Sequence, residues 1–287
     1  MKKQETHRVA PLPSSTRLLD YCVGVFETVS TKSALKKAFK KELIFLNDSV
    51  AHGSNYINGG EIITLYRDEE LFLKKQIELS LSVCYEDDHL AIIHKPAGIL
   101  VSGNKAKTIV NALSFNLKKS QQPDALLQPQ PAHRLDFATN GLLVIGKSKS
   151  ALQALNLLFK KKQIVKTYHA VTQGAMIKTQ HLDIAVDGKK SATNYKVLKT
   201  VASSKYVYLN LVQLQPLTGR RHQLRKHMAE IGSPILGDAL YGIEGAILKG
   251  KGLFLQASSL SFRHPFTSEE ISIMLPLPKK FQKLFPV

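Results

Sequence analysis

The stretch PAHRLDFATNGLLVIGKSKS, at 131–150, sets a carboxylate and basic side chains just ahead of an apolar run. The run at 142–145 is suited to a buried strand, and the TNG before it predicts a turn. In an extended segment Arg134 and Asp136 share one face. A carboxylate beside a cation favours its ionised form, which suits a nucleophile or an electrostatic stabiliser. A structural ion pair is the simpler explanation and, on residue type alone, the more common one.

A second group of charged side chains lies in PLTGRRHQLRKHMAEIG, at 216–232. Its four closely spaced cations are Arg220, Arg221, Arg225 and Lys226. The segment predicts a helix, which would stack Arg221 and Arg225 one turn apart. Stacked guanidinium groups repel each other unless an anion lies between them, so the pair is a candidate phosphate site. His222 and His227 have no third ligand in view, and we predict no metal site.

Tyr168 is the third candidate for chemistry. The alternating segment KTYHAV, at 166–171, predicts a strand in which Lys166 and Tyr168 share a face. A tyrosine beside a lysine on a buried face can act as an acid or a base. A core tyrosine with a satisfied hydroxyl is the simpler explanation.

The net charge indicates the class of partner. Forty basic side chains oppose twenty-two acidic ones, a formal charge of +18. The excess lies almost wholly after residue 70, because 1–70 carries about +1 and 71–287 carries +17. A field of this size attracts polyanions, which favours nucleic acid over an anionic membrane. A charge that serves only solubility is the alternative.

Missing patterns exclude several function classes. No apolar run reaches the length of about eighteen residues that a spanning helix needs, and MKKQETHRVA is not a secretory signal. Cys22 and Cys84 fit neither a metal site nor a disulfide framework, so we expect a cytoplasmic protein. HKPAGILVSG does not have the glycine spacing of a P-loop, and no GxGxxG follows a predicted strand. We therefore expect no nucleotide cofactor.

Hydrophobic periodicity divides the chain into a loose tail at 1–14, a small domain at 15–70 and a large domain at 71–287. In the small domain, TRLLDYCVGVF and STKSALKKAFKKE predict two helices, and LIFLN and EIITLY predict strands. The segment QQPDALLQPQP predicts a surface loop. In the large domain, strands in hairpin order outnumber crossover units. This order predicts an α+β fold with a large, mixed but mainly antiparallel sheet and flanking helices.

Five segments of the large domain resemble, in order, the RluA family of pseudouridine synthases. HRLDFATNGLLVIGKS is similar to the family's signature, YEDDHLAIIHKPAGILV to its upstream segment and KTYHAVTQG to its Lys-x-Tyr strand. TGRRHQLRKHMAEIGSPILGDALYG and FRHPFTSEEISIMLPLP resemble its arginine-rich helix and closing hairpin. The resemblance spans about 80–287. The segment 15–66 resembles, in degenerate form, the small α/β RNA-binding domain named after a ribosomal small-subunit protein.

This resemblance implies an enzyme that isomerises uridine in structured RNA, either ribosomal or transfer RNA, without a cofactor or metal. It implies that Asp136 is the catalytic aspartate, Tyr168 the active-site tyrosine and Arg225 the arginine that pairs with the aspartate. Arg134 matches an arginine that helps to eject the target base. The residues expected to contact the substrate are His133, Arg134, Arg220, Arg221, His222 and Gln223. We expect a monomer that acts on neither DNA nor membranes.

Two residues depart from the family's pattern, because Asn140 and Gly146 stand where serine and alanine are usual. Neither change removes an ionisable group. Asp136 would either attack the anomeric carbon or take a proton from its neighbour, and the sequence leaves both routes open. Two other functions also stay open. One is an RNA-binding or assembly factor without catalysis, and the other is a nucleobase glycosidase, which would favour a second carboxylate such as Asp238.

Overall fold

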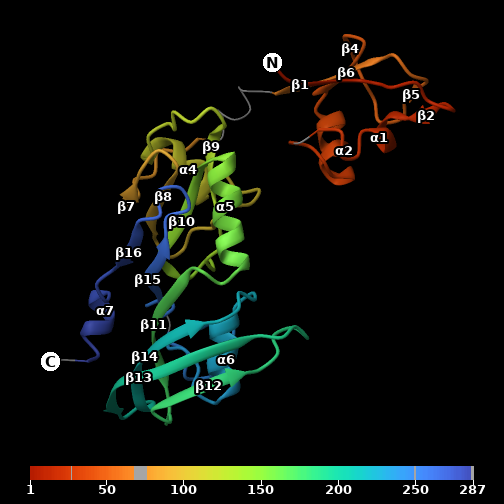
Figure 1. Ribbon diagram of the computed structural model, residues 1–287. Coiled ribbons are helices and arrows are strands. Elements are labelled where there is room, and N and C mark those ends of the chain that lie inside the picture. Colours follow the sequence, from red (N-terminus) through yellow and green to blue (C-terminus); the bar gives the residue numbers. More distant parts are fainter. Residues whose placement is uncertain (27, 68–75, 249, 286–287) are drawn as a thin grey trace. The chain divides into compact units, whose positions relative to one another are not determined.

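The computed structural model describes residues 1–26, 28–67, 76–248 and 250–285 (Figure 1). The chain forms two compact units, Met1–Gln76 and Ile77–Val287, which we call the N-terminal unit and the C-terminal unit. The boundary predicted from the sequence, between 70 and 71, falls outside the described residues. No helix in the described ranges has the length and apolar character needed to cross a bilayer.

The N-terminal unit is a small α/β domain. Its four-stranded sheet has the order β1 (Lys2–Arg8), β6 (Ile62–Arg67), β3 (Ile44–Leu46) and β4 (Ser49–Val50). A second pair of strands joins β2 (Thr16–Arg17) to β5 (Tyr56–Ile57), and the helices are α1 (Leu18–Tyr21) and α2 (Lys32–Lys40). Thr31 caps α2 by accepting a hydrogen bond from the backbone of Ala34.

The prediction of a loose tail at 1–14 is wrong. Residues 2–8 form β1, which pairs antiparallel with β6 over almost its whole length. Polar residues conceal this strand from hydrophobic patterning, because β1 lies at the edge of its sheet and is held by backbone hydrogen bonds. Val9, directly after the strand, is buried in the core of the unit and fixes where the segment docks.

The C-terminal unit is built on one long sheet. Its main order is β12 (Thr179–Asp183), β13 (Ala192–Ser203), β14 (Val207–Pro216), β11 (Val165–Gln173), β15 (Leu255–Arg263), β10 (Asn140–Ser148), β8 (Leu90–Lys95) and β7 (Ser82–Glu86). Two further strands pair at its sides: β16 (Glu270–Met274) with β15, and β9 (Ala125–Pro131) with β10. All these pairs are antiparallel except β10 with β15, so the predicted α+β class is confirmed.

Four helices flank this sheet (Figure 1): α4 (Ile109–Asn116), α5 (Lys149–Lys160), α6 (Gln223–Glu230) and α7 (Lys279–Gln282). Thr108 and Ser148 cap α4 and α5 through their hydroxyl groups. The predicted surface loop QQPDALLQPQP is wrong over its second half, because β9 pairs with β10 there. The two prolines of β9 are tolerated because this strand lies at the side of the sheet.

Two of the hydrophobic cores of the C-terminal unit border the site. One core gathers around β8, β10 and α4, with Ile93, Leu143 and Leu113 fully buried. The other gathers around β11, β14 and α6, with Val171, Val212 and Met228 fully buried. Tyr168 packs against both cores. The junction of the two cores is therefore the place where residues from distant parts of the chain meet.

Candidate active site

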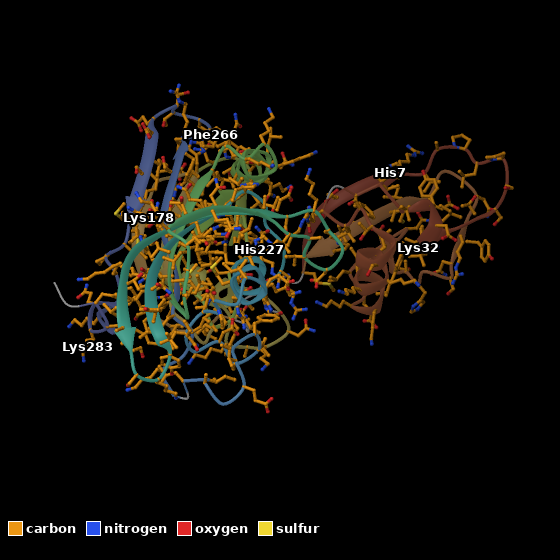
Figure 2. The ribbon with its side chains drawn as sticks, turned by 90° about the horizontal axis from the view of Figure 1, so that it is seen from below. His7, Lys32, Lys178, His227, Phe266 and Lys283 are labelled. Atoms are coloured by element: carbon orange, nitrogen blue, oxygen red, sulfur yellow. The ribbon has the colours of Figure 1, made fainter. Side chains whose placement is uncertain are left out.

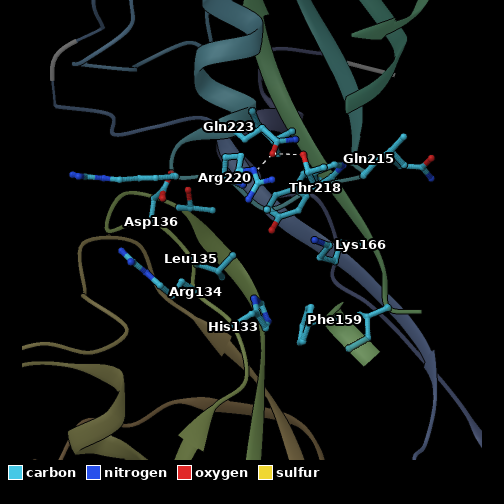
Figure 3. A pocket seen from close by; sticks show the side chains of 18 of the residues that line it. His133, Arg134, Leu135, Asp136, Phe159, Lys166, Gln215, Thr218, Arg220 and Gln223 are labelled. Atoms are coloured by element: carbon cyan, nitrogen blue, oxygen red, sulfur yellow. Dashed lines mark hydrogen bonds between the residues drawn. The ribbon is translucent and has the colours of Figure 1, made fainter. Parts of the chain in front are cut away.

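Asp136 lies on the loop that leads into β10. Leu135 is buried in the core beside β10, so its two neighbours, Arg134 and Asp136, project to the opposite side. Both line a cavity of about 640 Å³, a volume typical of a ligand site (Figure 3). Leu135 borders the same cavity, so the lining alone does not test the predicted sharing of a face by Arg134 and Asp136. The structural ion pair between them, weighed above as the simpler explanation, is not found among the described residues, and the guanidinium near Asp136 is that of Arg225.

A buried lysine holds the turn that carries Asp136. Lys95 is fully buried, and its ammonium donates hydrogen bonds to the carbonyl oxygens of Pro96 at 2.9 Å and Thr139 at 2.8 Å. Burial lowers the pKa of Lys95 to about 8, and the charge of Asp136 opposes this shift. The turn is closed by a hydrogen bond from the Thr139 amide to the Asp136 carbonyl at 3.1 Å. The sequence does not indicate that Lys95 supports this turn, because the segment KPAG indicates only the end of a strand.

Gly141 allows β10 to approach β15. Its φ of +126° is available to glycine and strained for other residues, and a Cβ atom there would overlap the backbone of Ala257. The parallel pairing of β10 with β15 consists of two residue pairs, Asn140 with Gln256 and Gly141 with Ala257. The turn, and with it Asp136, is thereby fixed against the strand that neighbours Tyr168.

Arg225 joins two carboxylates. Its Nε and one terminal nitrogen donate to the two oxygens of Asp238, each at 2.7 Å, and both side chains are almost fully buried. Its other terminal nitrogen lies 3.7 Å from Oδ2 of Asp136. Burial, the largest single effect, would raise the pKa of Asp238, but the hydrogen bonds and charge of Arg225 together with the backbone amides of Leu240 and Tyr241 lower it overall. The arrangement fixes the guanidinium so that one edge faces Asp136.

The predicted stacking of Arg221 on Arg225 is wrong. Helix α6 begins at Gln223, so Arg221 precedes the helix and is exposed. His222, the residue directly before the helix, has a left-handed backbone with a φ of 55°. The segment GRR therefore lies in a loop that turns into the helix, with the Gln223 amide donating to the Arg220 carbonyl at 3.2 Å, and all three of its residues line the cavity.

His222 approaches Asp136 from the side opposite Arg225. Its Nε2 lies 3.8 Å from Oδ1 of Asp136, and its Nδ1 lies 2.9 Å from the hydroxyl of Tyr241. Burial lowers the pKa of His222, and the charge of Asp136 partly opposes this effect. A neutral ring with hydrogen on Nε2 suits the nearby carboxylate, and the Tyr241 hydroxyl then donates to Nδ1. Asp136 thus has one polar neighbour at each oxygen.

Tyr168 lies on β11, between Leu214 of β14 and Ala257 of β15. It is half-buried and lines the same cavity as Asp136. Burial raises the pKa of its phenol, and the negative charge of Asp136 raises it further. The tyrosine is therefore held neutral at physiological pH. It can offer a ring face and a hydroxyl to a ligand, and it is a poor source of phenolate.

The other residues predicted to contact the substrate differ in their exposure and in the hydrogen bonds that already engage them. Arg134, Arg220 and Arg221 are exposed at the cavity rim, and Arg220 also donates to the Lys190 carbonyl at 3.1 Å. Gln223 lines the cavity but is buried. Its amide oxygen accepts from Thr218 and the Arg220 backbone, and its amide nitrogen donates to the Ala192 carbonyl and to Thr193 (Figure 3). This amide holds the rim in place, and the geometry argues against a direct substrate contact.

His133 is held in the cavity wall. Its Nε2 accepts a hydrogen bond from the Val144 amide at 3.1 Å, and its ring lies 4.8 Å from that of Phe159. Burial, aided by the charge of Lys166, lowers the pKa of His133 to about 3, so the ring is neutral. His133 therefore contributes shape and a polar ring instead of a charge.

The described residues contain no group of three ligands that could hold a metal ion. His227 is fully buried in α6 (Figure 2) and its Nε2 contacts Ser191 at 3.0 Å and the Ile184 carbonyl at 2.9 Å. The residues that sequence reasoning overlooked are those that support others: Lys95, Tyr241 and Phe159. The sequence suggests Asp238 only as the second carboxylate of a nucleobase glycosidase. It does not line the cavity, and Asp136 is the sole carboxylate that does so among the described residues.

Comparisons with known proteins agree with this geometry. Residues 89–230 match the family model described as RNA pseudouridylate synthase. "Ribosomal large subunit pseudouridine synthase D" of Buchnera aphidicola subsp. Acyrthosiphon pisum is 32% identical over 99% of both chains. "Ribosomal large subunit pseudouridine synthase C" of Rickettsia felis is 31% identical, covering 95% of this chain and 97% of its own.

A solved structure gives the same result for the fold. "Human RNA Pseudouridylate Synthase Domain Containing 4" superposes with a TM-score of 0.57 at 27% identity. The match covers 70% of this chain and 90% of the human one. The segment matched by the family model includes Asp136, Tyr168 and Arg225.

Proposed function

Because this chain belongs to the RluA family of RNA pseudouridine synthases, we propose that it converts particular uridines of large-subunit ribosomal RNA to pseudouridine. The chain is an enzyme that isomerises uridine within RNA. The names of its relatives favour ribosomal RNA over transfer RNA as the substrate. The observation that carries the assignment of the site is Asp136, a lone carboxylate in a cavity whose other charged side chains, among the described residues, are cations. A monomer in the cytoplasm remains our expectation.

The reaction exchanges one bond of the base for another. The bond between the anomeric carbon and N1 of uracil breaks, and a bond from the same carbon to C5 forms. The proton of C5 is lost and N1 gains one, so the atoms balance and no redox partner is needed. Asp136 is the group proposed to act at the sugar, either as a nucleophile or as a base. Arg225, 3.7 Å from its Oδ2, would balance the charge of the carboxylate and hold it toward the sugar.

A single carboxylate favours isomerisation over hydrolysis. Glycosidases typically use two carboxylates, one of which activates water or protonates the leaving group. Asp238 cannot serve as that second group, because both of its oxygens are held by Arg225. Tyr168 would stack on the detached uracil and keep water from the anomeric carbon. Its raised pKa favours a neutral hydroxyl, so we assign it to holding the base more than to removing the C5 proton.

The target base must leave its stack to reach the cavity, which costs a few kcal/mol. Cations at the cavity rim offset this cost by binding phosphates. The exposed candidates are Arg134, Arg220 and Arg221. Arg134 stands beside Asp136 on the same loop, which suits it to occupy the space that the base leaves.

The assignment is tested with purified protein and unmodified large-subunit rRNA made by transcription. Pseudouridine is mapped in the product for the wild type, for Asp136→Asn and for Asp187→Asn. Asp187 is an exposed carboxylate outside the cavity, so its variant is the matched control. We expect wild-type and Asp187→Asn protein to form pseudouridine at the same positions, and Asp136→Asn to form none. RNA affinity should change little in Asp136→Asn, since the change removes a negative charge.

The other outcomes separate the rival functions. Release of free uracil would identify a glycosidase. RNA binding with no change to any uridine would identify an assembly factor without catalysis. Modification of transfer RNA but not of the large-subunit transcript would overturn the proposed substrate. Substantial pseudouridine formation by Asp136→Asn would contradict the proposed role of Asp136.

A further inference from the structure

One end of the cavity has a cation that the proposed chemistry does not use. Lys166 lies on β11, two residues before Tyr168, and its side chain lines the cavity (Figure 3). The side chain is partly buried, and burial lowers the pKa of its ammonium. Among the described residues, no hydrogen bond or ion pair engages this ammonium. Its nearest described partner is the Phe159 ring, with the nitrogen 5.9 Å from the ring centre.

An unpaired, half-buried ammonium is costly unless a ligand compensates it. Partial burial removes hydration from the charge, and proteins usually repay that loss with a carboxylate or several carbonyl oxygens. Lys147, on β10, shows the usual solution. Its buried ammonium contacts Glu86 at 2.7 Å and the Asp87 carbonyl at 2.6 Å. Lys166 has no equivalent partner, and its surroundings point to an anion that comes from outside the protein.

The groups around Lys166 define the shape of this end. His133 and Phe159 form one wall, with ring centres 4.8 Å apart, and Figure 3 shows both well away from Asp136. His133 is neutral, so it does not compete for an anion. Lys160 and Lys162, at the end of α5, are exposed and also line the cavity. No carboxylate among the described residues lines this end.

We propose that Lys166 binds a phosphodiester group next to the target uridine, with the rings of His133 and Phe159 supporting the flanking sugar or base. This proposal rests on the proposed function, because it adds a subsite to the same cavity. The cavity of about 640 Å³ has room for more than a single base. Single-stranded RNA is commonly held by cations on its backbone together with aromatic side chains. The subsite would fix the flipped strand on both sides of Asp136.

A phosphate is favoured over the uracil as the partner of Lys166. The base is expected beside Asp136, whereas the Lys166 ammonium lies next to the Phe159 ring, on the part of the cavity wall away from Asp136 (Figure 3). A uracil carbonyl would leave the full positive charge uncompensated. A phosphodiester neutralises it and is present on each side of every target uridine.

The experiment measures RNA affinity against salt. Lys166→Met removes the charge and keeps the length of the side chain, Lys166→Arg keeps the charge, and Lys161→Met removes a nearby exposed charge that does not line the cavity. Filter binding to unmodified large-subunit rRNA transcript is repeated over a range of potassium chloride concentrations. Turnover at saturating RNA and the melting temperature are measured for the same proteins.

A phosphate contact has a specific signature. Lys166→Met should bind about tenfold more weakly at low salt, and the slope of log affinity against log salt should become shallower by about 0.7 to 0.9. Its turnover at saturating RNA should stay close to wild type, and its melting temperature without RNA should be equal or higher, because the uncompensated charge is gone. Lys166→Arg should restore both affinity and slope.

Three results would overturn the subsite. They are an unchanged salt slope in Lys166→Met, an equal change in Lys161→Met, and a loss of turnover with unchanged affinity, which would place the ammonium on the base. Absence of pseudouridine in the wild-type reaction is a separate result. It would refute the proposed function while the binding comparison remained interpretable, because binding needs no turnover.

Discussion

Replacing Asp238 with asparagine should reveal how strongly the Arg225 pair supports the active site. The carboxylate accepts two hydrogen bonds from Arg225 at 2.7 Å, and none of its side chain is exposed. It also accepts from the backbone amides of Leu240 and Tyr241. Asparagine has the same shape but only one oxygen and no charge. The guanidinium would keep only Asp136, 3.7 Å away, as a counter-charge.

The expected loss of stability follows from this geometry. Removing one partner of a buried ion pair costs about 3 to 5 kcal/mol. Because asparagine retains one acceptor, the lower end applies, and we expect about 3 kcal/mol. For a unit of this size, each kcal/mol lowers the melting temperature by about 2 to 4 °C. The C-terminal unit should therefore melt about 6 to 12 °C lower. Turnover should fall as well, because Arg225 would no longer be held toward Asp136.

Calorimetry of the full chain tests this prediction, with Asp187→Asn as the matched control. Asp187 pairs with Lys226, which lies on α6 as Arg225 does. Because Asp187 is mostly exposed, its loss should not shift the melting temperature measurably.

The structure also predicts how the stabilisation by Asp238 depends on pH. The pKa of Asp238 is lowered in the folded protein, so its contribution is present above about pH 4 and is lost as the pH falls further. Equal melting temperatures for Asp238→Asn and Asp187→Asn would refute the reasoning.

Two further predictions concern the loop that carries Asp136. Gly141→Ala should cost several kcal/mol and lower the yield of folded protein, because a Cβ atom meets the Ala257 backbone and φ is +126°; near-wild-type urea denaturation would contradict this. The second prediction compares the pH dependence of the stability of the wild type with that of Lys95→Met. Folded Lys95 has a pKa of about 8 against 10.5 in the unfolded chain, so wild-type stability relative to this variant should rise between these pH values, by about 3 kcal/mol. Parallel stability curves for the two proteins from pH 7 to 11 would argue against the buried charge.

The sequence was informative about residues that act through their own type and local spacing. Asp136 follows a buried leucine and precedes an apolar strand, so alternation alone predicts which way it points. Tyr168 alternates in the same way on β11. The α+β class follows from short strands in hairpin order. These features depend on residues close in the chain, which patterning can detect.

Features set by distant partners could not be predicted. Arg225 and Asp238 are thirteen residues apart and meet only because a loop folds back over α6. The start of α6 at Gln223 is fixed by an amide that bonds to β13, so local helix propensity at GRR is overridden. The strand at 2–8 has few apolar residues and forms through backbone pairing with β6. Tertiary hydrogen bonds decide all three cases.

The short seam between β10 and β15 gives the molecule a mechanical property. Asp136 belongs to the half of the sheet that packs with α4, and Arg225 to the half that packs with α6. Within the sheet, two parallel residue pairs join these halves at that seam. The separation of the carboxylate from the guanidinium therefore depends on how the two halves are held together, by these residue pairs and by the apolar core that β10 shares with β15 and β16. A change in the twist of the sheet at the seam would alter that separation.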